Sequence, residues 1–261
     1  MNVPIQIPSK AQNLSAILSI PEHSYCNNPI VLMCYGLNGD RADIHRIAYD
    51  AAMKFCRNGI ACLRFDYRGQ GVSDGEFIDT SMSSKKEDIL NAINFIKGCY
   101  YNETCTIVLL GFSDGAKIVS SVVALSRDIH SIFLWNPIFQ ELKDGVDHTK
   151  VKRLAKVDGT NKLAMPFLGL WLGVEHLQDI KTSNSIREFN DFVGRKVIIT
   201  GLNDPYTEPI RGKQLGIFDN DLIYDTVQNA NHTFSSLKCA DDLIDKTIWY
   251  LKNIMEKEKD E

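Results

Sequence analysis

The feature that most constrains this chain is an apolar, β-branched run at 106–110 that leads into Gly111-Phe112-Ser113-Asp114-Gly115. Such a run bounded by glycine predicts a buried strand, and apolar side chains recur after Gly115 with helical spacing. In a strand–turn–helix of this kind the serine sits in a strained turn, and both glycines leave room for neighbouring backbone. The sequence therefore predicts that Ser113 is a nucleophile exposed above a sheet edge. A glycine-serine turn without a chemical role is the alternative interpretation.

Length and charge exclude several classes of protein. The 261 residues, of which 44% are hydrophobic, fit one large α/β domain, and we expect a single domain, 1–261, with an insertion. The 29 basic and 33 acidic residues give a net charge of −4 without a basic block, which argues against a nucleic-acid partner. The chain has no secretory signal pattern and no run approaching the ~18 apolar residues of a membrane span. We therefore expect a soluble, cytoplasmic protein.

The chain has seven cysteines, an odd number that cannot all form disulfide pairs within it, and none belongs to a Cys-x-x-Cys motif. We interpret them as reduced core residues, including Cys34, which precedes a glycine-rich loop. The sequence contains no Cys/His metal spacing, no phosphate-binding glycine loop and no dinucleotide fingerprint. We therefore expect no metal and no cofactor.

Apolar runs alternate with helical patterns along the chain. Strands are expected at 29–36, 60–67, 106–110, 131–137, 195–202 and 221–227, and helices at 43–58, 84–100, from Gly115 onward and at 239–257. Residues 3–7 and 14–20 alternate partially and favour an antiparallel hairpin at one sheet edge. Strands that alternate with helices predict a mostly parallel, doubly wound sheet with helices on both faces.

Residues 138–194 depart from this alternation. Connections after parallel strands leave from their C-terminal ends, so we expect this segment to form a lid over Ser113. Phe167 and Trp171 are candidates to line an acyl or aryl pocket, although a small core within the lid explains the same composition about as well. We interpret the two histidines of the segment, His148 and His176, as solvated or structural.

A serine hydroxyl is a poor nucleophile at neutral pH, so it needs an imidazole to take its proton and a carboxylate to orient that imidazole. Among six histidines, His232 follows the last predicted strand directly, which places it at the same sheet edge as Ser113. Asp204 follows the strand at 195–202 and is the favoured acid. The rivals are Asp225, within a strand, and Glu208, which we expect on the following helix.

With this chain order of serine, aspartate and histidine, the sequence resembles the α/β-hydrolase superfamily over essentially its whole length. The segments 65–77 (FDYRGQGVSDGEF) and 229–234 (NANHTF) are similar to those of cinnamoyl/feruloyl esterase-like, serine aminopeptidase-like hydrolases. The resemblance implies the α/β-hydrolase fold and a Ser113–Asp204–His232 triad. It also implies an oxyanion hole formed by the backbone N–H groups of Leu37 and Asp114. Ser73, within the first segment, lacks the flanking strand and helix of a nucleophile.

Two positions depart from the pattern of this family. Tyr35 replaces the usual histidine before Gly36, which makes Tyr35 a candidate for contact with the substrate. Asp114 replaces an uncharged residue after the serine, where a carboxylate opposes an oxyanion. We interpret Asp114 as stabilising the helix N-terminus and pairing with Lys117. Recognition of a cationic or hydroxyl-bearing substrate group is the functional alternative.

Together these observations predict a serine hydrolase of the carboxylesterase type that cleaves esters through an acyl-enzyme intermediate. The site places few demands on the leaving group, so thioester hydrolysis and acyl transfer stay open. A non-catalytic binding protein of the same fold is the alternative from another class. The expected partner is a small-molecule ester or thioester, and the sequence does not decide between a monomer and a homodimer.

Overall fold

The computed structural model describes residues 1–22, 29–99, 106–123, 125–126, 128–139, 154–182, 185–207 and 222–257. Two of the seven cysteines, Cys26 and Cys105, lie outside these ranges, as do His148 and Glu208. So do Tyr100, at the predicted helix end, and Asp221, at the predicted strand start. Predictions that concern these residues stay predictions, and the others are compared with the structure below.

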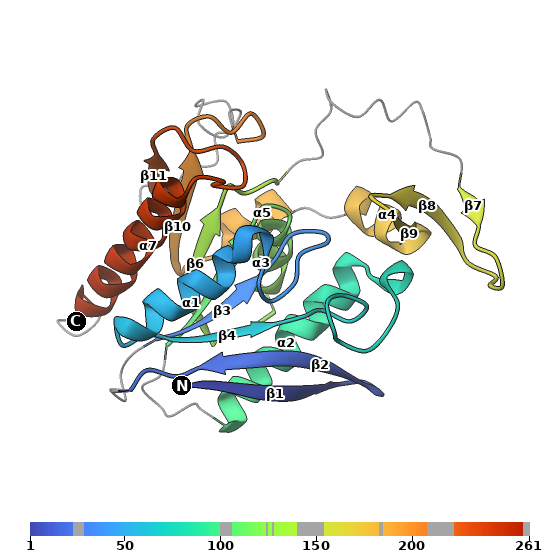
Figure 1. Ribbon diagram of the computed structural model, residues 1–261, viewed down its shortest axis with the longest axis horizontal. Helices are drawn as coiled ribbons and strands as arrows, with labels where there is room; N and C mark the ends of the chain where they lie inside the picture. Colours follow the sequence, from blue (N-terminus) through green and yellow to red (C-terminus); the bar gives the residue numbers. More distant parts are fainter. Residues whose placement is uncertain are drawn as a thin grey trace.

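An eight-stranded sheet forms the centre of the structure, in the order β1-β2-β4-β3-β5-β6-β10-β11 (Figure 1). Its strands are β1 (Asn2–Ser9), β2 (Gln12–Ser19), β3 (Ile30–Cys34), β4 (Ala61–Phe65), β5 (Ile107–Phe112), β6 (Ile129–Trp135), β10 (Arg195–Gly201) and β11 (Leu222–Val227). The hairpin β1–β2 is antiparallel and β2 is antiparallel to β4, whereas the pairs from β4 to β11 are parallel. This topology confirms the predicted mostly parallel sheet and its edge hairpin.

Helices cover both faces of the sheet (Figure 1). Helices α1 (Ile47–Arg57) and α7 (Leu237–Lys257) pack together on one face, and α2 (Met82–Cys99), α3 (Gly115–Val123) and α5 (Ser185–Asp191) pack on the other. Two short 3-10 turns, η1 (Ile44–Arg46) and η2 (Phe77–Asp79), follow strand exits. In the ranges that the structure covers, none of the helices is both long and apolar enough to cross a membrane.

Three helix starts differ from the prediction, and that of α2, at Met82, lies two residues before the predicted 84. Helix α1 begins at Ile47 and not at residue 43, because Asp43, His45 and Arg46 have φ angles of 56°, 55° and 64°. Such left-handed conformations cannot continue an α-helix. Helix α7 begins two residues earlier than predicted, at Leu237, where the Ser236 hydroxyl accepts a hydrogen bond from a backbone N–H of the first turn.

Residues 140–153 and 183–184 of the predicted lid, 138–194, lie outside the described ranges. The described part of 138–194 contains a second, three-stranded antiparallel sheet of β7 (Ala155–Lys156), β8 (Leu163–Phe167) and β9 (Leu170–Gly173), followed by α4 (Val174–Thr182). Strand β9 lies tightly on η2, because a Cβ at Gly173 would be 2.1 Å from the carbonyl oxygen of Ile78. Helix α4 packs on α2, where Asp179 accepts a hydrogen bond of 2.9 Å from the Ser83 N–H. Helix α5 instead packs on α3 and belongs to the helical layer of the sheet.

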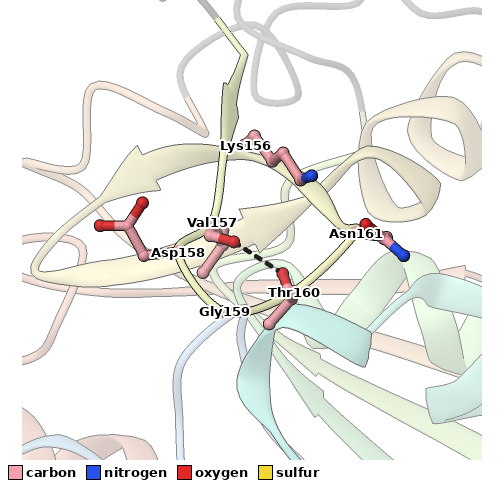
Figure 2. Close-up of a pocket in the computed structure, with 6 residues that line it drawn as sticks. All are labelled: Lys156, Val157, Asp158, Gly159, Thr160 and Asn161. Carbon is pink, nitrogen blue, oxygen red and sulfur yellow. Dashed lines mark hydrogen bonds between the residues drawn. The ribbon is translucent and has the colours of Figure 1, made fainter.

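The turn between β7 and β8 forms a hollow lined by residues 156–161 (Figure 2). All six residues come from the end of β7 and the turn that follows it. The turn is closed by a hydrogen bond of 2.9 Å from the Thr160 hydroxyl to the Val157 carbonyl. The hollow is therefore a consequence of the turn's shape, and it contains none of the predicted catalytic residues.

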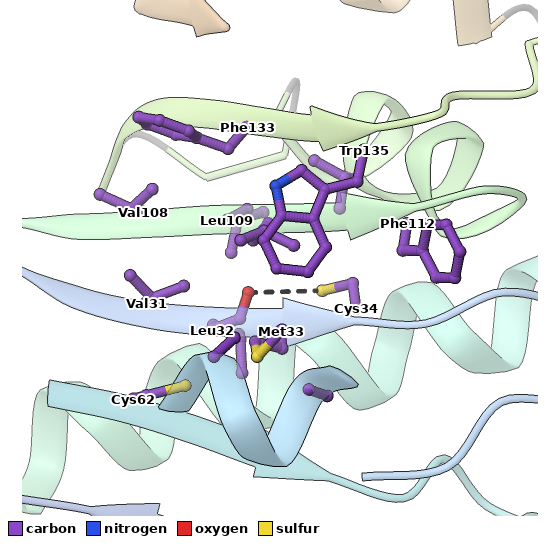
Figure 3. Close-up of a cluster of buried hydrophobic side chains, with 14 of the residues drawn as sticks. Val31, Leu32, Met33, Cys34, Cys62, Val108, Leu109, Phe112, Phe133 and Trp135 are labelled. Carbon is purple, nitrogen blue, oxygen red and sulfur yellow. Dashed lines mark hydrogen bonds between the residues drawn. The ribbon is translucent and has the colours of Figure 1, made fainter. Parts of the chain in front are cut away.

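The central strands form a rigid base for the site. Every residue of β3 and β5 is buried, as expected for strands covered on both faces. Figure 3 shows Leu32 and Leu109 on these neighbouring strands, with Trp135 of β6 beside them. The indole N–H of Trp135 donates to the hydroxyl of Thr247 on α7 at 3.0 Å. Each fully buried aliphatic side chain stabilises the fold by roughly 1.5–3 kcal/mol, so this region holds the loops at the strand ends firmly.

Candidate active site

Ser113 lies in the short turn between β5 and α3, with a φ of 55°. A non-glycine residue in this region carries strain of about 1–3 kcal/mol, which the surroundings must hold. The Ser113 N–H donates to the Trp135 carbonyl at 2.9 Å, and the Ser113 carbonyl accepts from the Ile138 N–H at 3.2 Å. A Cβ at Gly115 would be 2.4 Å from the Cys34 carbonyl oxygen, so the turn packs directly on the end of β3. The strained strand–turn–helix predicted from the sequence is present.

A chain of two hydrogen bonds starts at this serine. Ser113 Oγ lies 2.8 Å from His232 Nε2, and His232 Nδ1 lies 2.8 Å from Asp204 Oδ2. The Asp204 side chain is fully buried, and its other oxygen accepts the Tyr206 N–H at 2.9 Å. The His232 ring is stacked with Phe112 and has an edge contact with Tyr206. In this arrangement the imidazole can take the serine proton at Nε2 while the carboxylate accepts the Nδ1–H.

The rival residues are engaged elsewhere. Asp225 accepts hydrogen bonds from Lys246 at 2.7 Å and from the Tyr250 hydroxyl at 3.0 Å, both on α7. The Ser73 hydroxyl donates to the Asp66 carbonyl and accepts a backbone N–H of β2. These contacts support structural roles for Asp225 and Ser73.

Asn136 holds the histidine loop, and the sequence analysis did not single it out. Its side chain is fully buried. The amide nitrogen donates to the His232 carbonyl at 2.7 Å, and the amide oxygen accepts the Gly201 N–H at 2.7 Å. Asn136 therefore connects the end of β6 to the loop of His232 and to the end of β10. The only signal in the sequence was an asparagine between an apolar run and Pro137. Asparagine tolerates a positive φ better than most residues, and Asn136 has a φ of 40°.

The loop after β3 runs beside the serine. A Cβ at Gly36 would lie 3.7 Å from Ser113 Cβ and 3.9 Å from the Asp114 nitrogen. The carbonyl oxygens of Gly36 and Leu37 accept hydrogen bonds from the ammonium group of Lys85 at 3.0 and 2.9 Å. The sequence analysis did not single out Lys85, although this lysine occupies the same helical face as the buried apolar residues of α2. The backbone that carries Leu37 is thus held next to Ser113.

Asp114, directly after the serine, forms an ion pair of 3.0 Å with Lys117. Burial on its own would raise the pKa of Asp114, but the ammonium groups of Lys117 and Lys85 outweigh that effect and hold the pKa below its ordinary value. The predicted pairing with Lys117 is confirmed, and it neutralises the carboxylate that would otherwise oppose an oxyanion at Ser113.

His176 of α4 is a buried imidazole near this ion pair. Its side chain is 1% exposed, and neither ring nitrogen has a hydrogen-bond partner in the part of the chain that the structure describes. Burial lowers the pKa of His176 to about 4, so the ring is neutral at physiological pH. Of the two interpretations given above, the structure excludes a solvated side chain.

Three further residues were predicted to contact substrate. Tyr35 is 1% exposed, and burial raises the pKa of its hydroxyl well above the usual value. Phe167 is half-buried on β8, and Trp171 is 39% exposed on β9. Within the described ranges, no hydrogen bond or ring contact connects these side chains to Ser113 or His232. Their contact with substrate stays a prediction.

The ranges that the structure describes also bear on metal binding. There, no group of three or more histidine, cysteine, aspartate or glutamate side chains is arranged to hold a metal ion.

The sheet order and the position of the serine turn define the class of α/β hydrolases. Residues 27–185, more than half of the chain, match the family described as serine aminopeptidase, S33, and the chain belongs to this family. In the solved structure of Est1E from Butyrivibrio proteoclasticus with bound ferulic acid, the same fold recurs with a TM-score of 0.76 at 18% identity, covering 98% of this chain and 100% of the other.

Two curated relatives match a shorter part of the sequence. An uncharacterized 31.7 kDa protein in the traX-finO intergenic region of Escherichia coli is 29% identical over 122 residues, 47% of this chain and 41% of the relative. A polyketide transferase of Stachybotrys chlorohalonatus is 28% identical over 137 residues, 52% of this chain and 45% of the relative. The chain thus spans less than half the length of these relatives.

Proposed function

We propose that this protein is a serine hydrolase that cleaves carboxylic esters through an acyl-enzyme intermediate. The observation that carries the proposal is the chain of two hydrogen bonds, each 2.8 Å long, from Ser113 through His232 to Asp204. A serine bonded to an imidazole, which is bonded in turn to a buried carboxylate, is the arrangement that activates a hydroxyl for acyl transfer.

In the proposed reaction, Ser113 Oγ attacks the ester carbonyl while its proton passes to His232 Nε2. The backbone N–H groups of Leu37 and Asp114 donate to the resulting oxyanion. Collapse of the tetrahedral intermediate expels the alcohol, which takes the proton from His232. A water molecule then attacks the acyl-enzyme with His232 as base, and release of the acid regenerates Ser113. The carboxylate of Asp204 stabilises the imidazolium formed in each half.

Thioester hydrolysis or transfer of the acyl group to an acceptor other than water would use the same residues. The Stachybotrys relative is named a polyketide transferase, which supports acyl transfer as the second candidate. The structure of Est1E contains ferulic acid, which is a carboxylic acid and thus a possible product of ester hydrolysis, and this favours ester hydrolysis as the first candidate. A panel of aryl esters, acyl thioesters and aminoacyl substrates, ranked by kcat/KM with and without an added acyl acceptor, separates these possibilities.

The nucleophile is tested with a labelled fluorophosphonate, which reacts covalently with activated serines. The wild type and the control Ser73→Ala are expected to be labelled, and Ser113→Ala is expected to remain unlabelled. Labelling of Ser113→Ala at another residue would refute the assignment. A wild type that neither reacts nor hydrolyses any substrate of the panel would favour a non-catalytic binding protein.

We further propose that residues 138–194 act as a lid that selects the acyl or alcohol group. Phe167→Ala and Trp171→Ala are expected to change the ranking of bulky esters more than the rate on a small acetyl ester. An equal loss on every ester, in proportion to lost thermal stability, would show that both side chains only stabilise the lid itself.

A further inference from the structure

Lys85, on the first turns of α2, is a charged side chain that the proposed reaction does not use. It is fully buried, and its ammonium group lies 4.7 Å from the centre of the Tyr67 ring. Burying a charge is costly unless polar partners replace the lost water. Those partners are the carbonyl oxygens of Gly36 and Leu37, at 3.0 and 2.9 Å. The buried ammonium group is therefore bonded to the loop beside the nucleophile.

The geometry of one peptide unit connects Lys85 to the site. The Gly36 carbonyl and the Leu37 N–H belong to the same planar trans peptide, so they point in opposite directions. Binding the carbonyl to Lys85 turns the N–H away from the lysine. Gly36 itself lies against Ser113, because a Cβ there would be 3.7 Å from Ser113 Cβ. The following carbonyl, of Leu37, is held by Lys85 and also by Gln70. Both peptide units that flank Leu37 are thus clamped.

The charge of Lys85 is not cancelled by an ion pair among the described residues. Of the neighbouring carboxylates, Asp114 pairs with Lys117 and Asp88 pairs with Arg68. The third, Asp43, accepts the backbone N–H of Ile44 at 2.7 Å. A cation bonded to a peptide oxygen polarises that peptide and makes its N–H a stronger donor, and the effect is large where water is excluded. An oxyanion beside Ser113 would therefore be stabilised through the peptide as well as by the positive charge itself.

We propose that Lys85 is a positioning residue that fixes and polarises the Gly36–Leu37 peptide, so that the Leu37 N–H is directed to the oxyanion before substrate binds. This inference rests on the proposed function, since it assigns to Lys85 a part in the oxyanion hole of that reaction. Lys85 itself touches neither the substrate nor the reacting atoms.

The test compares Lys85→Met, which keeps the chain length but removes the charge and the donors, with Lys86→Met on the next position of α2. On one aryl ester, Lys85→Met is expected to lower kcat about 10- to 100-fold with KM within about threefold, since loss of a whole oxyanion donor costs about 10²- to 10³-fold. Lys86→Met is expected to stay within about twofold of wild type.

A second readout separates positioning from general support of the fold. Phenylboronic acid forms a tetrahedral anionic adduct with an activated serine, and its affinity is expected to fall with Lys85→Met by the same factor as kcat. Equal kcat and equal boronate affinity in Lys85→Met and Lys86→Met would overturn the proposal. If the wild type shows neither boronate inhibition nor fluorophosphonate labelling, the proposed function fails, whereas an active wild type with an unaffected Lys85→Met refutes only the role of Lys85.

The pH dependence of wild-type activity gives a further test, in which Lys85→Gln, which keeps a polar side chain, is the comparison. The ionisable groups facing the ammonium group are those of Cys34, Asp43, Tyr67, Asp88, Asp114 and His176. Burial lowers the pKa of Lys85 to about 8, so its charge is present below that pH and lost above it. Wild-type kcat is expected to fall as pH rises through 8, and Lys85→Gln is expected to lack this step. The same step in Lys85→Gln, or no step in the wild type, would contradict the proposal.

Discussion

The close approach of Gly115 to the end of β3 predicts the effect of Gly115→Ala. The added Cβ would lie 2.4 Å from the Cys34 carbonyl oxygen and 2.7 Å from that of Tyr35. Ordinary contacts between carbon and a carbonyl oxygen are about 3.3 Å or longer, so the two backbones must separate by about 1 Å. Overpacking of this kind costs about 1–3 kcal/mol, and we expect the upper value because two backbone atoms are involved.

This cost translates into two measurable losses. For a chain of 261 residues, about 3 kcal/mol lowers the thermal midpoint by about 6–9 °C. The displacement also moves the loop of Gly36 relative to Ser113, and a misplacement of about 1 Å lowers kcat about 100-fold. Circular dichroism during heating and kcat on a small ester measure the two effects.

Gly98→Ala is the matched control for Gly115→Ala. A Cβ at Gly98 would meet nothing within 4 Å, and Gly98 lies within α2. Alanine stabilises an exposed helical position by roughly 0.5–1 kcal/mol relative to glycine, so the midpoint is expected to rise by about 1–3 °C with unchanged kcat. A Gly115→Ala variant as stable and active as Gly98→Ala would refute the steric reasoning.

Three further substitutions test the site. His232→Ala is expected to lower kcat on the order of 10³-fold or more, with the thermal midpoint within about 2 °C of wild type; a variant that unfolds would show a structural histidine. Asn136→Ala leaves the buried Gly201 N–H without its acceptor, so urea denaturation is expected to show a loss of about 2–3 kcal/mol, and an unchanged midpoint would contradict the role of this side chain. Asp114→Asn leaves the buried ammonium group of Lys117 without its ion pair, so the free energy of unfolding is expected to fall by about 3 kcal/mol near neutral pH. Because the folded pKa of Asp114 is lowered, the contribution of the carboxylate is present above the ordinary value of 3.8 and lost as pH falls through the folded pKa. Midpoints of wild type and Asp114→Asn should therefore converge at low pH, and a constant difference would refute the ion-pair explanation.

The sequence predicted the parts of the structure that depend on local pattern. The apolar runs of β3 and β5 are continuous because both faces of these strands are buried. Gly111 and Gly115 flank a serine because only glycine permits the close backbone contacts of the turn. Since parallel strands end at one edge, Ser113, Asp204 and His232 could be predicted to meet from their positions directly after strands.

Contacts between distant segments could not be predicted in this way. In the sequence, Lys85 cannot be distinguished from a solvated surface lysine. Only the packing of α2 against the loop of Gly36 brings its ammonium group to the Gly36 carbonyl oxygen. The sequence indicates only that Asn136 lies at the end of a strand. In the structure, its amide is hydrogen-bonded to the end of β10 and to the loop of His232. A buried polar side chain acquires its partners from elements far away in the chain, whereas a strand or a turn acquires its conformation from its neighbours. The sequence by itself thus determined the strands, the serine turn and the residues at one sheet edge, and the tertiary structure decided which polar groups hold that edge in place.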